Sequence, residues 1–87
     1  MDARVQVYST VACGYCVRAK ALLQRLSIPF REIDVTEDAD KRQWLVGTTG
    51  QRTVPQIFID GRSIGGFTEL AALERAGGLN TLLTVTA

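Results

Sequence analysis

Cys13 and Cys16 are the residues of this 87-residue chain whose type and spacing point most directly to chemistry. A cysteine thiolate is a nucleophile that attacks the sulfur of a disulfide. Two residues that are three positions apart in a helical turn lie about 5–6 Å from each other, within the range that a disulfide accepts. Cys13 can therefore attack a disulfide, and Cys16 can then resolve the product by pairing with Cys13.

The elements that must position this pair are a strand before it and a helix after it. The segment Arg4–Tyr8 alternates apolar and polar residues, as a strand does. Behind the cysteines, apolar residues recur with the spacing of an amphipathic helix: Tyr15, Ala19, Leu22, Leu23 and Leu26. Backbone N–H groups in the first turn of a helix lack partners and would stabilise a thiolate at Cys13. The helix dipole adds only about 0.3–1 kcal/mol, so direct hydrogen bonds must supply most of the stabilisation.

Two other interpretations of the cysteines are a buried structural disulfide and a pair of inert core thiols. The absence of histidine from the sequence excludes His-based zinc sites, Cys–His nucleophiles and Ser–His–Asp triads. Two cysteines do not complete a tetrahedral thiolate site within one chain. The motif heuristic favours a redox-active pair, and no obligatory metal is expected.

Composition limits the possible partners and the compartment. Hydrophobic residues make up 46% of the chain, which suits one globular domain over residues 1–87. The net charge is +1 with both signs interspersed, so we expect no nucleic-acid partner. No apolar run approaches the ~20 residues of a membrane span, and no signal-peptide region opens the sequence. We therefore expect no membrane association and a cytoplasmic location, where a C-x-x-C pair is more often catalytic than structural.

The order of predicted elements is β-α-β-α-β-β-α-α. The first two strands should be parallel, and the last two should form an antiparallel hairpin through the Asp60-Gly61 turn. This order is that of an α/β, thioredoxin-like fold, with a mixed four-stranded sheet flanked by helices. The predicted strands are Arg4–Tyr8, Phe30–Val35, Gln56–Ile59 and Arg62–Ile64. The first two predicted helices are Cys13–Leu26 and a helix that begins at Thr36 or Asp38 and reaches about Gly47, followed by a loop at Thr48-Thr49-Gly50. The last two are Glu69–Ala76, capped by Thr68, and a short helix around Leu79, Leu82 and Leu83. Thr84–Ala87 is predicted to be a tail.

Three motifs occur together in this chain: Cys13-Gly14-Tyr15-Cys16, the segment from Thr53 to Ile59 that contains Val54-Pro55, and Gly65-Gly66 before an acidic helix start. Together they resemble the glutaredoxin family, and its bacterial dithiol class in particular. The resemblance spans nearly the whole chain. It implies a glutathione-dependent thiol–disulfide oxidoreductase that reduces protein disulfides and glutathione mixed disulfides. Glutathione would be the co-substrate, the partners would be glutathionylated or disulfide-bearing proteins such as ribonucleotide reductase, and the protein would be a monomer.

The resemblance also assigns roles around the cysteines. Cys13 would be the attacking catalytic residue and Cys16 the resolving one. Tyr15 matches the aromatic residue of the family's Cys-Pro-Tyr-Cys motif and would form a wall of the glutathione groove; the alternative is a core ring on the helix stripe. Val54-Pro55 matches the family's cis-proline, and with Thr53 it would present backbone groups that pair with glutathione as one strand pairs with another.

Two further positions match the family's carboxylate sites. Gly66, Phe67 and Thr68 match the segment that binds the γ-glutamyl carboxylate, which suits a helix N-terminus because its N–H groups bind anions. Thr68 is also compatible with a simple N-cap. Arg42 stands where the family carries a residue for the glycyl carboxylate, and an arginine binds carboxylates well. The alternative for Arg42 is an ordinary solvated helix face.

Two departures from the family pattern keep other functions open. Val11 stands where many glutaredoxins have lysine, which removes one cation near the thiolate and leaves open an electron donor fed by thioredoxin reductase. Gly14 replaces the usual proline of the motif. In family members with glycine or serine there, a [2Fe–2S] cluster can bridge two chains with glutathione as co-ligand, so Cys13 would be a ligand in an iron–sulfur carrier.

Overall fold

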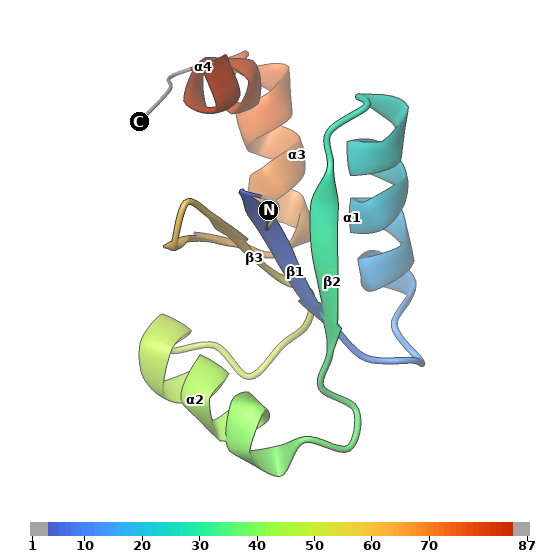
Figure 1. Ribbon diagram of the computed structural model, residues 1–87, viewed down its shortest axis with the longest axis vertical. Helices are drawn as coiled ribbons and strands as arrows, with labels where there is room; N and C mark the ends of the chain where they lie inside the picture. Colours follow the sequence, from blue (N-terminus) through green and yellow to red (C-terminus); the bar gives the residue numbers. More distant parts are fainter. Residues whose placement is uncertain (1–3, 85–87) are drawn as a thin grey trace.

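The structure is a computed structural model that describes residues 4–84, and its helices and strands follow the predicted order. The fold class is confirmed as α/β, with one mixed four-stranded sheet and flanking helices (Figure 1). Within residues 4–84, no helix combines the length and the apolar composition that a membrane span requires. The elements are β1 (Val5–Ser9), α1 (Gly14–Arg25), β2 (Phe30–Asp34), α2 (Ala39–Thr49), β3 (Gln56–Ile59), β4 (Arg62–Gly65), α3 (Phe67–Arg75) and α4 (Gly78–Thr84).

The sheet has the strand order β2-β1-β3-β4. β1 runs parallel to β2 and antiparallel to β3, and β3 and β4 form an antiparallel hairpin. The turn of this hairpin is Asp60-Gly61, and both residues have positive φ angles (52° and 80°). The predicted parallel pair and the predicted hairpin are therefore both confirmed.

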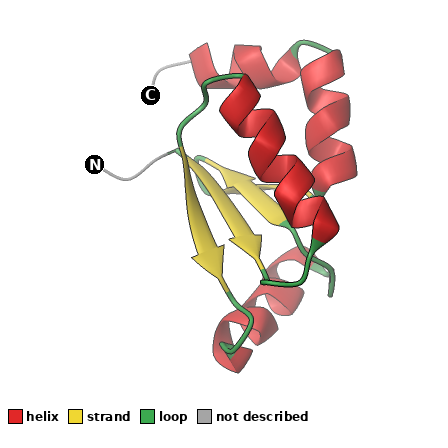
Figure 2. Cartoon of the chain, turned by 90° about the vertical axis from the view of Figure 1, so that its right-hand side faces the viewer, coloured by secondary structure: helices red, strands yellow, loops and turns green. Residues whose placement is uncertain are grey.

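Helices cover both faces of the sheet, and each face has its own apolar core. On one face α1, α3 and α4 pack on alternate residues of β1 and β3, such as Val7 and Ile57. On the other face α2 places Leu45 against Phe58. Figure 2 shows that α1 and α3 lie together, apart from α2, and that the N-termini of α1 and α3 lie near the same end of the sheet. At that end Cys13, at the N-cap of α1, meets the loop before β3.

The predicted C-terminal end of α2 is wrong, whereas Asp38, one of the two predicted caps, is confirmed. The helix does not end near Gly47 but continues through Thr48 and Thr49, which were predicted to be in a loop. Gly47 is tolerated inside the helix because a glycine there costs only about 1 kcal/mol. The helix ends at Gly50, which adopts a left-handed conformation (φ 73°) and donates its N–H to the Val46 carbonyl at 2.9 Å. At the other end Asp38 is the N-cap, with its carboxylate accepting from the Lys41 N–H.

The predicted start of α3 is also wrong. Gly66, not Thr68, is the N-cap, and the helix begins at Phe67. Glu69 determines this start because its Oε1 accepts the Gly66 N–H at 2.8 Å. At the far end α3 stops at Arg75, and Ala76 is its exposed C-cap residue. Thr84, predicted to belong to a tail, lies in α4, and the rest of that predicted tail lies outside the described residues.

Candidate active site

Cys13 occupies the N-cap of α1. Its backbone is extended (φ −134°, ψ 107°), and its Sγ accepts the backbone N–H of Cys16 at 3.1 Å. The same Sγ lies 3.4 Å from the carbonyl oxygen of Val54, to which the thiol donates. The expected hydrogen bond from the first helical turn is therefore present. Cys13 is half-buried, and its sulfur lies between α1 and the loop before β3.

Cys16 has a different environment from Cys13. Its side chain is only 1% exposed, inside the first turn of α1. Burial is the largest cause that raises the pKa of the Cys16 thiol to about 12, and the hydrogen bond with the neighbouring Cys13 thiol is the next, while a backbone hydrogen bond at Thr10 and the charge of Lys20 act against the rise. Both cysteines are free thiols in this structure. At neutral pH Cys16 is accordingly a protonated thiol in the protein interior.

A groove of about 200 Å³ lies beside Cys13 and brings together most of the predicted binding residues. Tyr15 is 58% exposed, so its interpretation as a core ring is wrong. Its ring lies 6.2 Å from that of Phe67, and the two rings line the same hollow. The residues that line the groove are Tyr15, Thr53, Val54, Pro55, Gly66, Phe67, Thr68 and Glu69.

The Val54-Pro55 peptide bond is cis, as the family resemblance implied. Pro55 is buried below the groove, Val54 is half-buried and Thr53 is exposed. Below them Gln56 donates its amide Nε2 to the Thr53 carbonyl oxygen at 2.9 Å, which fixes the loop from beneath. The loop before β3 is thus held against the sheet, with its backbone at the rim of the groove.

The opposite wall of the groove is the N-terminus of α3. Phe67 and Thr68 lie in the first turn, where the helix itself supplies no acceptor for their N–H groups. Gly66 approaches Pro55 closely, since an added Cβ would lie 3.3 Å from the Pro55 carbonyl oxygen. Glu69 was not among the predicted site residues. A glutamate three positions after a helix N-cap is a recognisable capping signal, and here it also lines the groove.

Arg42 does not line this groove. It lies on the exposed surface of α2 and lines a neighbouring hollow of about 160 Å³. The two hollows share Thr53 and Val54, so the hollow that contains Arg42 adjoins the groove at the residue whose carbonyl oxygen contacts Cys13. Arg52 lines the same hollow and was also absent from the predicted site residues. Because Arg52 directly precedes Thr53 in the sequence, it could have been predicted to lie near the binding residues.

The sequence of the chain matches that of a known family. The family model described as Glutaredoxin matches residues 5–64. This chain belongs to the glutaredoxin family. It is 46% identical over 81 residues to Glutaredoxin 3 of Escherichia coli (strain K12), covering 93% of this chain and 98% of the relative. It is also 46% identical over 80 residues to a glutaredoxin of Pseudomonas aeruginosa, covering 92% of this chain and 95% of the relative.

A solved structure supports the same conclusion. The crystal structure of a buckwheat glutaredoxin–glutathione complex superposes with a TM-score of 0.87 at 36% identity, covering 94% of this chain and 77% of that one. The family and the fold make the protein a thiol–disulfide oxidoreductase. The sequence holds one pair of cysteines, the C-x-x-C of Cys13 and Cys16.

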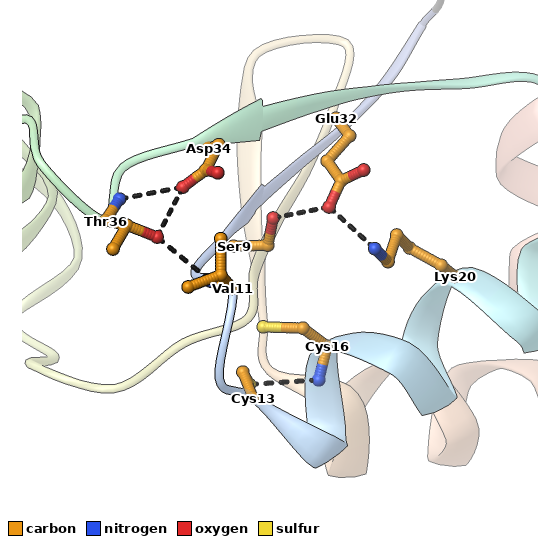
Figure 3. A network of polar contacts seen from close by, with 8 residues as sticks. All are labelled: Ser9, Val11, Cys13, Cys16, Lys20, Glu32, Asp34 and Thr36. Carbon is orange, nitrogen blue, oxygen red and sulfur yellow. Dashed lines mark hydrogen bonds and ion pairs between the residues drawn. The ribbon is translucent and has the colours of Figure 1, made fainter.

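A polar network lies next to the active-site helix of this glutaredoxin, as Figure 3 shows. Lys20 Nζ forms an ion pair with Glu32 Oε2 at 2.7 Å, and the Ser9 hydroxyl donates to the same oxygen at 2.7 Å. The hydrogen bond from Lys20, followed by that from Ser9, lowers the pKa of Glu32. Lys20 follows Cys16 by one helical turn, and its charge favours a thiolate there. Sequence reasoning missed this network, although the spacing of Lys20 from Cys16 was visible.

The two departures from the family pattern leave open surface around Cys13. Val11 is 77% exposed, and its N–H donates to Thr36 Oγ1 at 2.9 Å. An added Cβ at Gly14 would meet no atom within 4 Å. Among residues 4–84, no three His, Cys, Asp or Glu side chains are grouped so that they could hold a metal ion.

Proposed function

We propose that this glutaredoxin is a glutathione-dependent oxidoreductase of the cytoplasm that acts as a monomer on protein disulfides and glutathione mixed disulfides. Disulfide-bearing enzymes of the ribonucleotide reductase type would be among its partners. The observation that carries the proposal is the position of Cys13 Sγ. This sulfur is at the N-cap of α1, 3.4 Å from the Val54 carbonyl oxygen, at the edge of a groove with backbone groups on one wall and a helix N-terminus on the other.

The reaction follows from the different environments of the two thiols. The Cys13 thiolate attacks the glutathione sulfur of a mixed disulfide, and the sulfur–sulfur bond breaks so that the protein thiolate leaves and takes up a proton. A second glutathione thiolate can then attack the glutathione sulfur, which releases glutathione disulfide and regenerates the Cys13 thiolate. Alternatively Cys16 loses its proton and attacks Cys13 Sγ, which releases glutathione and closes the intramolecular disulfide.

The groove offers complementary groups along the length of glutathione. The backbone of Thr53 and Val54 would pair with the cysteinyl residue as an added strand. The N–H groups of Phe67 and Thr68 would donate to the γ-glutamyl carboxylate at the positive end of α3. Arg42, in the adjoining hollow, would hold the glycyl carboxylate. The similar buckwheat protein was crystallised as a glutathione complex.

A glutathione-coupled disulfide assay tests the proposal. Cys13→Ser should abolish turnover, whereas Cys16→Ser should keep reduction of glutathione mixed disulfides, because glutathione itself can resolve the adduct. Arg42→Gln should raise the KM for glutathione, and Arg62→Gln, which removes an equal charge on β4, should not. Full activity of Cys13→Ser would contradict the assignment of the two thiols.

The remaining interpretations give different outcomes. If thioredoxin reductase, and not glutathione, reduces the oxidised protein, the groove does not serve glutathione. If anaerobic reconstitution with iron, sulfide and glutathione gives a brown dimer that reverts to an active monomer on oxidation, the protein has a second role as a cluster carrier through Cys13. A colourless monomer that stays active throughout the reconstitution would support the oxidoreductase role alone.

A further inference from the structure

A second groove, of about 420 Å³, runs between α1 and α3 and is not part of the glutathione surface described above. Its floor is apolar, and its rims carry charged side chains. Two helix faces build it, because its lining residues recur at helical spacing on each helix. These residues are Arg18, Ala21, Leu22 and Arg25 on α1, and Phe67, Ala71, Glu74 and Arg75 on α3.

The charge of this α1/α3 groove is strongly positive compared with the whole chain, whose net charge is only +1. Arg18, Arg25 and Arg75 line it, and Glu74 is the one acidic residue among its lining residues. All three arginines are exposed, and within residues 4–84 none of them forms an ion pair. Three guanidinium groups around an apolar floor suit a ligand that combines carboxylates with apolar contacts.

The α1/α3 groove is continuous with the active-site groove. Phe67 lines both hollows. Arg18 lies over the ring of Tyr15, with its Cζ 5.5 Å from the ring centroid, so it stands at the junction. Both helices begin near the active-site end of the sheet and lead away from it (Figure 2). A polypeptide that places its cysteine at Cys13 can therefore continue along the α1/α3 groove.

The length of the groove fixes which part of the polypeptide would lie in it. From Cys13 to Arg18 along α1 is about 8 Å, and from Cys13 to Arg25 about 18 Å, at 1.5 Å per residue. An extended chain advances about 3.3 Å per residue. Side chains roughly two to five positions from the reacting cysteine would thus reach the arginines.

We propose that the α1/α3 groove binds an acidic segment of the protein substrate, with carboxylates about two to five residues from the cysteine that is reduced. This inference names a substrate class for the proposed function and rests on it. Glutathione already has its own surface, so the α1/α3 groove selects among protein substrates and leaves small disulfides unaffected. Arg25 and Arg75 are the specificity-determining residues, because they lie farthest from the glutathione groove.

The size of the expected effect follows from the exposure of the arginines. An exposed arginine–carboxylate pair contributes about 0.2–1 kcal/mol, and charge at the rim of an interface acts mainly on the association rate. Removing Arg25 and Arg75 together should therefore lower kcat/KM for an acidic substrate about threefold to tenfold. Salt of about 0.5 M should remove most of the difference, since the Debye length is then only about 4 Å.

The experiment compares glutathionylated peptides that differ only in the residues two to five positions from the cysteine, on one side or the other, with Glu, Gln or Lys there. We expect the wild-type protein to prefer the Glu peptide. The Arg25→Gln/Arg75→Gln variant should lose this preference while keeping its rate on the mixed disulfide of glutathione and 2-mercaptoethanol. The Lys41→Gln/Arg62→Gln variant, with an equal loss of charge on α2 and β4, should keep the preference.

Equal use of the Glu and Gln peptides by the wild-type protein would overturn the inference, and so would an equal loss in both double variants. A failure of the proposed function would differ, because the small mixed disulfide would then not be reduced either. In that case an NMR titration with an unreactive Glu peptide, with serine in place of its cysteine, still decides. Amide shifts confined to α1 and α3 would support the α1/α3 groove as a binding site, and shifts elsewhere or none would refute it.

Discussion

The burial of Cys16 makes the stability of the reduced protein depend on pH in a definite direction. Burial raises the pKa of this thiol to about 12, whereas a thiol in an unfolded chain titrates near 8.5. The folded protein therefore keeps this proton over a pH range in which the unfolded chain has lost it. The stabilising contribution of the neutral thiol is complete below about pH 8.5 and is lost as the pH rises through the folded-state pKa.

The magnitude follows from the difference between the two pKa values. Each pKa unit corresponds to about 1.4 kcal/mol. At about pH 10 the unfolded thiol has ionised through roughly 1.5 units while the folded thiol stays neutral, so the free energy of unfolding should fall by about 2 kcal/mol relative to pH 7. The total free energy of unfolding of a small domain is about 5–15 kcal/mol, so a loss of this size is easily measured.

Urea denaturation of two variants isolates this contribution. Cys13→Ser prevents the disulfide and keeps a capping side chain on α1, and the double variant Cys13→Ser/Cys16→Ala also removes the titrating thiol. Trp44, the one tryptophan of the sequence, reports unfolding because its ring stacks on Phe58 at 5.7 Å. Titrations of lysine and tyrosine are common to both variants and cancel. If the two pH profiles run parallel up to pH 10, the interior accepts a Cys16 thiolate and the reasoning is wrong.

Other predictions concern the loop before α3 and the network beside α1. Gly65→Ala should lower the free energy of unfolding by about 2–4 kcal/mol in denaturant titrations, because Gly65 has φ 112° and its Cβ would lie 2.7 Å from Glu69 Oε1. The control Gly47→Ala faces open space inside α2 and should stabilise by about 0.5–1 kcal/mol; equal effects of the two would contradict the first prediction. Lys20→Met should cost about 0.2–1 kcal/mol at neutral pH. This loss of unfolding free energy should begin to shrink below about pH 4.3, where the unfolded carboxyl takes up its proton, and should vanish as the pH falls through the lowered pKa of Glu32. A loss that stays constant down to pH 2 would refute the role of the ion pair.

Much of the fold could be predicted because its signals are local. Alternation marked the strands, helical periodicity marked α1, and Asp60-Gly61 marked the hairpin that the structure contains. The order of these elements leaves few ways to arrange the sheet, since a parallel pair needs a crossover and a short turn gives an antiparallel pair. The errors occurred where two residues competed for one role. The sequence predicted that α2 ends near Gly47, whereas the left-handed conformation of Gly50 ends the helix after Thr49.

Much of the binding surface could not be predicted from residue patterns alone, because it forms where distant segments meet. The family resemblance identified Tyr15, the Thr53–Pro55 segment and the Gly66–Thr68 segment, and the structure places all of them around one groove. No local pattern indicates that Arg25 and Arg75 flank a common hollow, because they are fifty residues apart in the sequence. Their juxtaposition depends on how α1 packs against α3.

The structure also distinguishes the two thiols, which the C-x-x-C spacing alone does not. A disulfide needs both cysteines, and their spacing in the sequence does not say which of the two thiols reacts first. At the N-cap Cys13 is half-buried, and its sulfur accepts the Cys16 N–H and lies 3.4 Å from the carbonyl oxygen of Val54, which lines the groove. Cys16, one turn further along α1, is buried and keeps its proton. A bulky disulfide can reach only the first sulfur, whereas the second can react only with a sulfur already joined to the first. The order of the two proposed steps is therefore a consequence of where α1 begins.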